Sequence, residues 1–468
     1  MNNDRKQVDL LLTHGQIITM DQERRILRDG AIAIRGGRIV AVGPYQEVAP
    51  AVRASRERDL QGALVHPGFV DAHVHVIYHL TRGLVPDHYP RNRIWEEIEL
   101  PLIAEITPEE EHLSALLACM EMALNGTTTF ADAGSAFNVD PAAEAVKMVG
   151  LRGIVGEHLE DVPRGIPRLY KPTEQCLDRI KTLLERYPRD LDSRVWCAVS
   201  LVGMGRASDE LLKEGKALAD QHRVPLTMHQ SHDDQEIVDS IQRYGKRPVE
   251  HLADIGILGS NLTLVRMILV DESEIDLVAK SGGCVIHCPS ASIKHGKGVS
   301  HIGHVPEMLQ AGIPVALGSD SPNWSNSFDV GHLAYLAATI HREARRQVPT
   351  ISAETALEMA TLYGAQALGL ADEIGSLEMG KHADIVIHSL DKPEAHPGLD
   401  PVADLVYAMR SKTVQTVLVD GHPLVEDGRL TTLDAQDTYA QVDGAARELA
   451  RRIGVNLEPR WHGVAKSV

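Results

Sequence analysis

Two histidines stand two positions apart in the segment Val70-Asp71-Ala72-His73-Val74-His75, which ends a short apolar run. Side chains two positions apart on a β-strand point to the same face, so the imidazoles of His73 and His75 can reach one site. A neutral imidazole is a good ligand for zinc, iron or cobalt. The pair alone is a weak signal, and its meaning depends on where the strand lies in the fold.

Two other potential ligands also end apolar segments. His229 follows Leu226-Thr227-Met228, and Asp320 follows Leu317-Gly318-Ser319. Three imidazoles and one carboxylate can hold one divalent metal ion and leave room for a water molecule. Such an ion lowers the pKa of its bound water towards about 7 and polarises a carbonyl group. Asp320 would then accept the proton as the water attacks. The ligand set suits zinc, iron, cobalt and manganese, of which we expect zinc.

The elements that must position these residues alternate between strand and helix. Helices are predicted over Thr107–Asn125, Ser208–His222 and Asp271–Lys280, and Ser208 and Asp271 are good N-caps. Apolar strands are predicted over residues 67–75, 127–133, 153–160, 194–203, 225–232, 262–269, 284–289 and 314–320. This alternation predicts an α/β fold with a closed (β/α)8 barrel of the TIM type, in which the chemistry lies at the C-terminal ends of the strands. The four potential ligands all lie at such ends.

Both ends of the chain are instead rich in short strands. The alternation in Ala31-Ile32-Ala33-Ile34 and the Gly36-Gly37 turn indicate a hairpin. A similar block returns near the C-terminus, and neither block has enough apolar residues for a large core of its own. We therefore expect one small composite β-sandwich from residues 1–65 and 375–430, a barrel over 66–374, and a C-terminal helical tail over 431–468 with an amphipathic helix near 434–453.

The composition limits the kind of partner. The chain has 468 residues, 43% of them apolar, and a formal net charge of −18. This acidic balance argues against nucleic acid and anionic membranes as partners, because both require a basic face. No segment has the roughly 18 consecutive apolar residues of a membrane helix, and no secretory signal pattern is present. The five scattered cysteines fit a reducing compartment. We expect a cytoplasmic protein that acts on a small molecule and forms a homodimer or larger homo-oligomer.

Several segments together resemble the amidohydrolase superfamily. They are PGFVDAHVH (67–75), NGTTTFAD (125–132), HCPSASIKHGKG (287–298), VALGSDSPNWSN (315–326) and LEMGKHADIVI (377–387). More narrowly, they look like the branch that holds chlorohydrolases, aromatic-base deaminases and hydrolases of N-substituted ureas or carbamates. The resemblance covers nearly the whole chain. It implies the barrel fold and metal chemistry, and it says much less about the substrate.

Two positions depart from the pattern of that branch. Its deaminases and chlorohydrolases usually carry His-x-x-Glu on strand five, where the glutamate protonates a ring nitrogen, but His232 stands there in this chain. They also usually carry a histidine at the end of strand six, and Arg266 falls at that position. Binuclear relatives place a bridging lysine or glutamate after strand four, and residues 198–203 contain neither. We therefore expect one metal ion per chain.

These departures decide which reaction the sequence favours. Ring deamination needs an acid for the ring nitrogen, whereas hydrolysis of an amide, urea or carbamate only needs a proton for the leaving amine, which Asp320 or His232 could supply. We expect a hydrolase of such a non-peptide C–N bond, similar to the phenylurea and molinate hydrolases that degrade xenobiotics. The alternative is a deaminase or dechlorinase of a triazine, pterin or purine-like heterocycle. A catalytically inactive binding protein is disfavoured, because all four ligands are retained.

The remaining candidate residues surround the expected metal site. His232 could be a general acid, a donor to the substrate or an extra metal ligand. Arg266 could bind a substrate carbonyl or pair with a carboxylate, and Asp71 could hold a ligand imidazole from behind. Further substrate contacts are expected from the loops after strands seven and eight, at Lys294, His295, Trp324 and Asn326.

Overall fold

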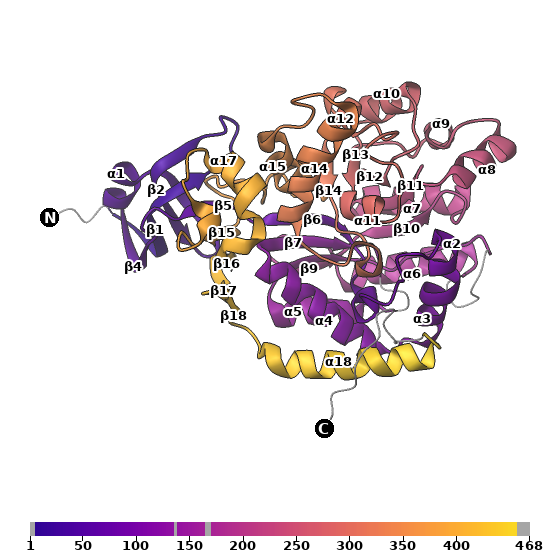
Figure 1. The fold of residues 1–468 in the computed structure, drawn as a ribbon, viewed down its shortest axis with the longest axis horizontal. Coiled ribbons are helices and arrows are strands. Elements are labelled where there is room, and N and C mark those ends of the chain that lie inside the picture. Colours follow the sequence, from indigo (N-terminus) through magenta and orange to yellow (C-terminus); the bar gives the residue numbers. More distant parts are fainter. Residues whose placement is uncertain (1–4, 135–137, 164–169, 456–468) are drawn as a thin grey trace.

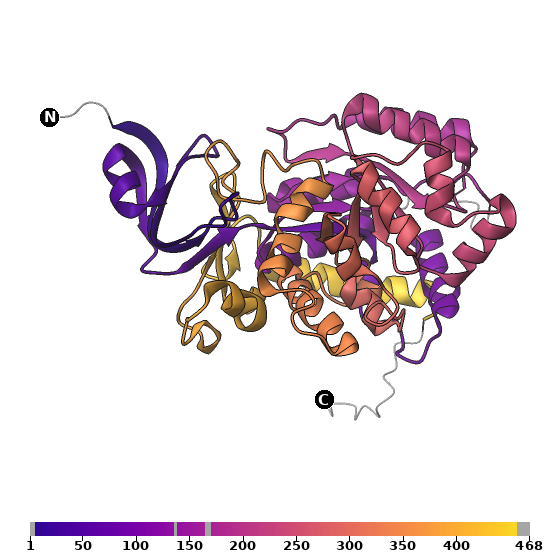
Figure 2. The ribbon, with the colours of Figure 1, turned by 90° about the horizontal axis from the view of Figure 1, so that it is seen from above.

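The computed structural model places a (β/α)8 barrel beside a smaller β domain, and helix α18 (Ala435–Arg452) lies along the barrel (Figure 1). The structure describes residues 5–134, 138–163 and 170–455. In the turned view the β domain and the barrel again lie side by side (Figure 2). The predicted fold class is therefore confirmed, while the predicted domain boundaries remain predictions.

The barrel wall is parallel throughout. Its strands are β6 (Phe69–Val74), β7 (Thr127–Asp132), β8 (Arg152–Val155), β9 (Val195–Cys197), β10 (Val199–Gly203), β11 (Leu226–Gln230), β12 (Leu262–Arg266), β13 (Cys284–His287) and β14 (Val315–Leu317). Strand β9 pairs with β8, and β10 pairs with β11. The short strands β9 and β10 together therefore occupy the fourth strand position of the barrel. A bridge between Val74 and Asp320 closes the wall between the first and last strands.

Five barrel strands (β8, β11, β12, β13 and β14) end two or more residues earlier than the sequence predicts, and β8 and β14 illustrate this. Strand β8 stops at Val155 rather than running to residue 160, and only isolated bridges at Leu159 and Glu160 continue it. Strand β14 stops at Leu317, because the backbone of Asp320 turns into the left-handed region with φ of 64°. Both early ends leave polar side chains free to face the barrel mouth.

The predicted helices are present with their caps. Helix α4 (Pro108–Leu124) begins with a capping box, while Ser208 caps α7 (Asp209–His222) and Asp271 caps α10 (Glu272–Ser281). The other barrel helices are α2 (Arg91–Ile94), α3 (Leu100–Glu105), α5 (Asp140–Val149), α6 (Thr173–Arg186), α8 (Asp234–Tyr244), α9 (Pro248–Asp254), α11 (Pro289–Lys294), α12 (Val305–Gln310), α13 (Pro322–Ser325), α14 (Val330–Arg345), α15 (Ala353–Ala360) and α16 (Leu362–Ala367), with the short turns η2 (Val76–Thr81) and η3 (Trp95–Glu99). The tail helix α18 packs buried Val442 and Leu449 towards the barrel.

The β domain is one sheet built from both ends of the chain, as expected. Its strands are β1 (Lys6–Ile18), β2 (Ile26–Arg35), β3 (Arg38–Pro44), β4 (Val52–Asp59), β5 (Leu64–Pro67), β15 (Ile385–His388), β16 (Val414–Val419), β17 (His422–Glu426) and β18 (Arg429–Leu430), joined by α1 (Tyr45–Val48), η1 (Ala49–Ala51), η4 (Pro393–Ala395), α17 (Pro401–Ala403), η5 (Asp404–Met409) and η6 (Arg410–Thr413). The two ends meet where β5 pairs antiparallel with β15. Leu12, Ile32, Ile385 and Leu418 share one buried apolar cluster, so neither end has a complete core without the other.

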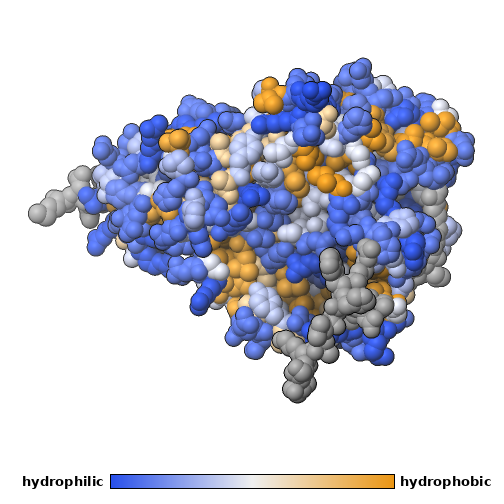
Figure 3. Space-filling view, viewed as in Figure 1, coloured by the Kyte–Doolittle hydropathy of each residue, from blue (hydrophilic) through white to orange (hydrophobic). Residues whose placement is uncertain are grey.

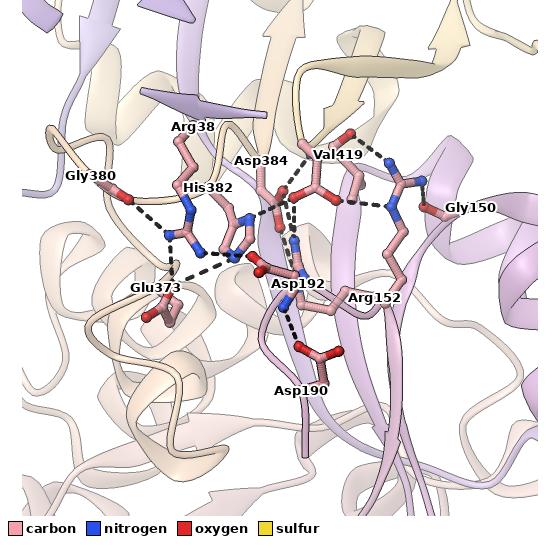
Figure 4. Close-up of polar contacts among 12 residues, drawn as sticks. Arg38, Gly150, Arg152, Asp190, Asp192, Glu373, Gly380, His382, Asp384 and Val419 are labelled. Atoms are coloured by element: carbon pink, nitrogen blue, oxygen red, sulfur yellow. Dashed lines mark hydrogen bonds and ion pairs between the residues drawn. The ribbon is translucent and has the colours of Figure 1, made fainter. Parts of the chain in front are cut away.

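A buried ion network joins the β domain to the barrel at the end opposite the strand C-termini. Arg152, at the start of β8, is 2% exposed and donates to Asp384 and, at 2.7 Å, to Asp420 (Figure 4). Asp420 also lies 2.6 Å from His382 and accepts from Arg194. Although burial raises the pKa of Asp420, the hydrogen bond with His382 and the charges of Arg152 and Arg194 bring it well below the usual value.

The molecular surface is largely polar on the face that Figure 3 shows. Apolar residues on this face gather in separate small patches. In the described part of the chain, no helix combines the length and apolar character needed to cross a membrane. All five cysteines lie in this part, and each is buried and free.

Replacing Arg152 with methionine tests the network. Arg152→Met leaves the buried carboxylate of Asp384 without its cation, while the partly buried Asp420 keeps Arg194 and His382; breaking a buried pair from one side costs about 3–5 kcal/mol. We expect the free energy of unfolding, measured by urea denaturation, to fall by about 3 kcal/mol. The control Arg447→Met removes an exposed pair with Asp443 on α18 and should leave stability unchanged. A comparably small change in both variants would show that the network does not join the two units.

Candidate active site

The four expected metal ligands lie together at the barrel mouth. One ligand atom from each of His73, His75, His229 and Asp320 can be chosen so that all lie within 4.8 Å of one another. The Nε2 atoms of His73 and His75 are 3.9 and 3.7 Å from Oδ1 of Asp320. His73 and His75 come from the end of β6, His229 from β11, and Asp320 from the turn after β14.

The chemistry of these side chains fits a divalent cation. Burial lowers the pKa of His73 and His75 to about 3 and that of His229 well below the usual value, so all three rings are neutral and carry a free lone pair. Nε2 of His73 is buried without a hydrogen-bond partner among the described residues, which is costly unless an ion satisfies it. Nδ1 of His229 lies 3.3 Å from the carbonyl oxygen of Val202, which leaves Nε2 for the site.

The backbone around Asp320 is shaped to present its carboxylate. Asp320 adopts a left-handed φ of 64°, a conformation that few non-glycine residues adopt and that aspartate tolerates better than most. The turn is held because the Asp320 amide donates to the carbonyl oxygen of His73 at 2.9 Å. Two residues earlier, a Cβ on Gly318 would lie 2.8 Å from Ile286 and 2.9 Å from Cβ of His73, so only glycine allows the two chain segments to approach.

Asp71 has a different partner from the one expected. Its two carboxylate oxygens accept from the amide of Ser319 at 2.9 Å and from the Ser319 hydroxyl at 2.5 Å, so the expected bond to a ligand imidazole is replaced by one to the last strand. Asp71 lies two residues before His73 on β6, so its side chain is on the same face of the strand but one layer deeper in the barrel. At that depth it meets the segment that follows β14. Asp71 therefore fixes the segment that carries Asp320. Its burial raises the pKa of this carboxyl to about 7.

Arg266 pairs with the metal-ligand carboxylate. Its Nη2 donates to Oδ2 of Asp320 at 2.5 Å, and the side chain is only 7% exposed. Burial alone would raise the pKa of Asp320, but the charge of Arg266 brings it far below the usual value. Of the two roles left open for Arg266, the structure shows the ion pair. Asp320 therefore has one oxygen towards the histidines and the other on Arg266.

His232 lines the mouth beside the metal ligands. Its ring lies 5.7 Å from the ring of His229, and its Nδ1 is 3.2 Å from Oε2 of Glu236. Glu236 is held in turn by the backbone amides of Ser231 and His232, at 2.8 and 3.1 Å. Burial lowers the pKa of His232, while Glu236 opposes this effect. Sequence reasoning missed Glu236, because only the turn into α8 brings it back to the ring.

A cavity of about 450 Å³ opens from the metal site. His75, His229, His232, Arg266 and Trp324 lie in its lining. The segment after β6 forms one wall through Tyr78, Arg91, Trp95 and Glu99, and α8 forms the opposite wall through Gln235, Arg243 and Tyr244. A volume of this size lies within the usual range for small-molecule sites.

Three expected substrate contacts lie behind the cavity wall. Lys294, His295 and Asn326 are not among the described residues that line the cavity. Lys294 ends the short helix α11 and hydrogen-bonds with Asn326, and the ring of His295 packs 4.4 Å from that of Trp324. The sequence predicted a loop here, but the helix turns Lys294 away. These residues support Trp324, whose indole nitrogen donates to Glu99.

Two further cavity residues were not singled out in the sequence. The ring of His158, beyond β8, lies 5.6 Å from the rings of both His75 and His229. His158 follows the third barrel strand, just as His229 follows an apolar strand segment, so the same sequence pattern could have identified it. Lys297 lines the cavity three residues after Lys294 and is 8% exposed. No sequence rule separates these two lysines, because the end of α11 decides which one turns inward.

Substitution of one ligand should remove the metal. His229→Gln removes an imidazole, so we expect metal content to fall from about one ion per chain to near zero after dialysis. His158→Gln changes a neighbouring ring outside the ligand set and should retain the metal. Inductively coupled plasma mass spectrometry measures both contents. Full metal retention by His229→Gln would contradict the ligand assignment.

Arg266 should stabilise the metal-free protein. Arg266→Met leaves the buried Asp320 carboxylate without its cation, and we expect the metal-free form to lose about 3 kcal/mol of stability. Adding zinc should then raise Tm by more than it does in the unchanged protein, because the ion becomes the compensating charge. Arg91→Met, which changes another arginine of the cavity lining, is the matched control. Equal zinc-induced rises in all three proteins would show that Arg266 and the metal do not share Asp320.

Comparison with known proteins extends these findings. A family model described as "Amidohydrolase family" matches residues 64–424, and one described as "Imidazolonepropionase-like composite domain, bacteria" matches residues 30–51. The 5-methylthioadenosine/S-adenosylhomocysteine deaminase of Syntrophobacter fumaroxidans is 36% identical over 443 residues, covering 95% of this chain and 99% of the relative.

Solved structures agree with this result. The adenosine deaminase of Xanthomonas campestris, with bound zinc, superposes with a TM-score of 0.88 and 29% identity, covering 97% of this chain and 100% of that one. A triazine hydrolase of Arthrobacter aurescens gives a TM-score of 0.86 and 25% identity, covering 93% and 99%. The chain therefore belongs to the amidohydrolase family and is a metal-dependent hydrolase that acts on carbon–nitrogen bonds other than peptide bonds.

Proposed function

We propose that this protein is a zinc-dependent deaminase that releases ammonia from an amino-substituted nitrogen heterocycle, with adenine nucleosides as the first class to test. This is the alternative that the sequence ranked second to hydrolysis of an amide, urea or carbamate. The observation that carries the proposal is the pair of His232 and Glu236 beside the metal ligands, at the position where an acid is required. The deaminase names of relatives that match nearly the full chain support it.

The metal ion supplies an activated water when it is bound. His232 performs the step for which the sequence offered no carboxylic acid. In its protonated form the ring donates from both nitrogens, so Nδ1 can hold Glu236 while Nε2 gives its proton to a ring nitrogen of the substrate. The adjacent amino-bearing carbon then accepts the water oxygen.

Asp320 completes the proton balance. Its Oδ1 faces the histidine ligands and can take the proton of the attacking water, while Arg266 holds Oδ2 and fixes the carboxylate plane. The proton returns to the amino group, which leaves as ammonia. The ring carbon keeps the oxygen as a carbonyl, and the hydroxyl proton lost in this step returns to His232. Because Arg266 makes Asp320 a weak base, the proton is released readily to the amine.

The cavity walls suit a planar ring. Tyr78, Trp95 and Trp324 line the cavity, and large aromatic side chains present flat apolar faces to a heterocycle. The Trp324 ring is fixed by its bond to Glu99 and by contact with His295. A ring that enters between these walls reaches the histidine ligands at the inner end.

One observation favours the other reaction. Arg266 occupies the position at the end of strand six where the related deaminases usually carry a histidine. Its guanidinium could also donate to a carbonyl oxygen of the substrate. Hydrolysis of a urea or carbamate needs such a donor and no acid for a ring nitrogen. The two reactions release different products, ammonia in one and a substituted amine in the other.

A substrate panel with variants of His232 separates the reactions. Metal-loaded protein is assayed on adenosine, 5-methylthioadenosine, an aminotriazine, an N-aryl urea and a carbamate, with ammonia and free amines both quantified. We expect ammonia release, with kcat lowered about 10²–10⁴-fold in His232→Ala, because a general acid contributes this much. His232→Glu should restore part of the rate.

The control for this experiment is His222→Ala, at the end of α7 and outside the cavity lining. It should keep the full rate. Release of a substituted amine from the urea or carbamate, with no ammonia from any heterocycle, would overturn the proposal. An unchanged kcat in His232→Ala would remove His232 from the mechanism.

A further inference from the structure

Lys297 is a buried cation with no acidic partner. Its side chain is 8% exposed and lines the cavity, yet in the described residues neither an ion pair nor a hydrogen bond connects its ammonium group to a carboxylate. A buried lysine is almost always paired. Its Nζ lies 4.8 Å from the centre of the Trp324 ring. Burial and the nearby charge of Arg266 lower the pKa of Lys297 to about 7, which reflects this lack of compensation.

A second cation lies at the same aromatic side chain. The guanidinium of Arg266 is 5.7 Å from the centre of the Trp324 ring, and its charge is matched by Asp320. The like charges of the two groups repel each other, and the charge of Arg266 contributes to lowering the pKa of Lys297, while Asp320 opposes this effect. This wall of the cavity therefore presents two basic groups beside the carboxylate of Asp320, although the chain as a whole carries −18.

The described acids in the cavity lining have other partners: Glu160 accepts from Arg206 at 3.0 Å and Asp239 accepts from Gln235 at 2.8 Å. Glu236 accepts from backbone amides and lies against His232, and Glu99 accepts from Trp324 and Asn323. Asp233 lies 3.7 Å from Arg91. These contacts leave the ammonium group of Lys297 to be compensated by something that enters the cavity.

We propose that Lys297 and Arg266 form a subsite beside Trp324 for a carboxylate carried by the substrate. The inference rests on the proposed function and narrows it to amino-heterocycles with an acidic substituent close to the reacting ring. A monoanion matches the single uncompensated charge, whereas a phosphate dianion would exceed it. The ammonium group and the guanidinium offer charge-assisted hydrogen bonds to such a group in a site shielded from water.

Binding of benzoate and of neutral benzamide to the metal-loaded full chain tests the subsite by calorimetry. We expect benzoate to bind about tenfold more tightly than benzamide, and Lys297→Met to abolish this preference. Lys297→Arg keeps the charge and should retain the preference, which separates loss of charge from loss of folding. Lys280→Met changes an exposed lysine on α10 and should also retain it.

Two outcomes would overturn the subsite. One is equal binding of benzoate and benzamide by the unchanged protein. The other is a benzoate preference that survives in Lys297→Met, because the metal alone would then hold the carboxylate. Ammonia release from neutral aminoheterocycles is measured in the same preparations. Ammonia release without a carboxylate preference would refute the subsite and leave the deaminase proposal standing. A Lys297-dependent preference without any ammonia release would support the subsite and refute the deaminase proposal.

Discussion

The carboxylate of Asp320 is fully buried, and the site is arranged around the compensation of its charge. A buried carboxylate is costly unless cations and hydrogen bonds surround it. Here Arg266 donates to one oxygen, the amide of Ser321 donates to the other, and Nε2 of both His73 and His75 lies within 4 Å of the latter. The left-handed turn at Asp320 and the close approach at Gly318 are the local backbone features that bring these groups together.

The same constraint links the site to the closure of the barrel. The bridge between Val74 and Asp320 joins the first and last strands, and the bonds from Ser319 to Asp71 hold the same seam one layer deeper. The metal ligands on β6 and the carboxylate after β14 therefore keep their spacing because the barrel is closed there. Stability is provided at the other end, where Arg152 and the acids of the β domain fasten the barrel to the sheet. The candidate metal site and the ion network of Arg152 thus lie at opposite ends of the barrel strands.

The four expected metal ligands and the eight strand positions of the barrel were predictable, because each depends on a local sequence pattern. A histidine pair at period two and polar residues that end apolar runs are visible without tertiary information, and Ser208 and Asp271 cap their helices as their residue types predict. Residues whose place in the site depends on where a following helix begins or ends were not predictable in this way. Glu236 reaches His232 only because α8 starts where it does, and Lys297 faces inward while Lys294 faces outward because α11 ends between them.

The ranking of reactions shows the same limit. The sequence favoured a carbonyl substrate because the strand-five glutamate and the strand-six histidine are both missing, which is a statement about two single positions. It could not show that another carboxylate, Glu236, stands behind His232, since that pair forms across a turn. Likewise, the role of Asp71 depended on which strand lay nearest, and the pairing of Arg266 with Asp320 depended on closure of the barrel.

The most direct test of the account is the position of the metal. Anomalous diffraction at the metal absorption edge, from crystals of the metal-loaded protein, locates the ion independently of any assay. The account predicts one peak per chain, bonded to the imidazoles of His73, His75 and His229 and to the carboxylate of Asp320. A peak elsewhere, two peaks per chain, or an Asp320 that stays on Arg266 without contacting the ion would contradict it.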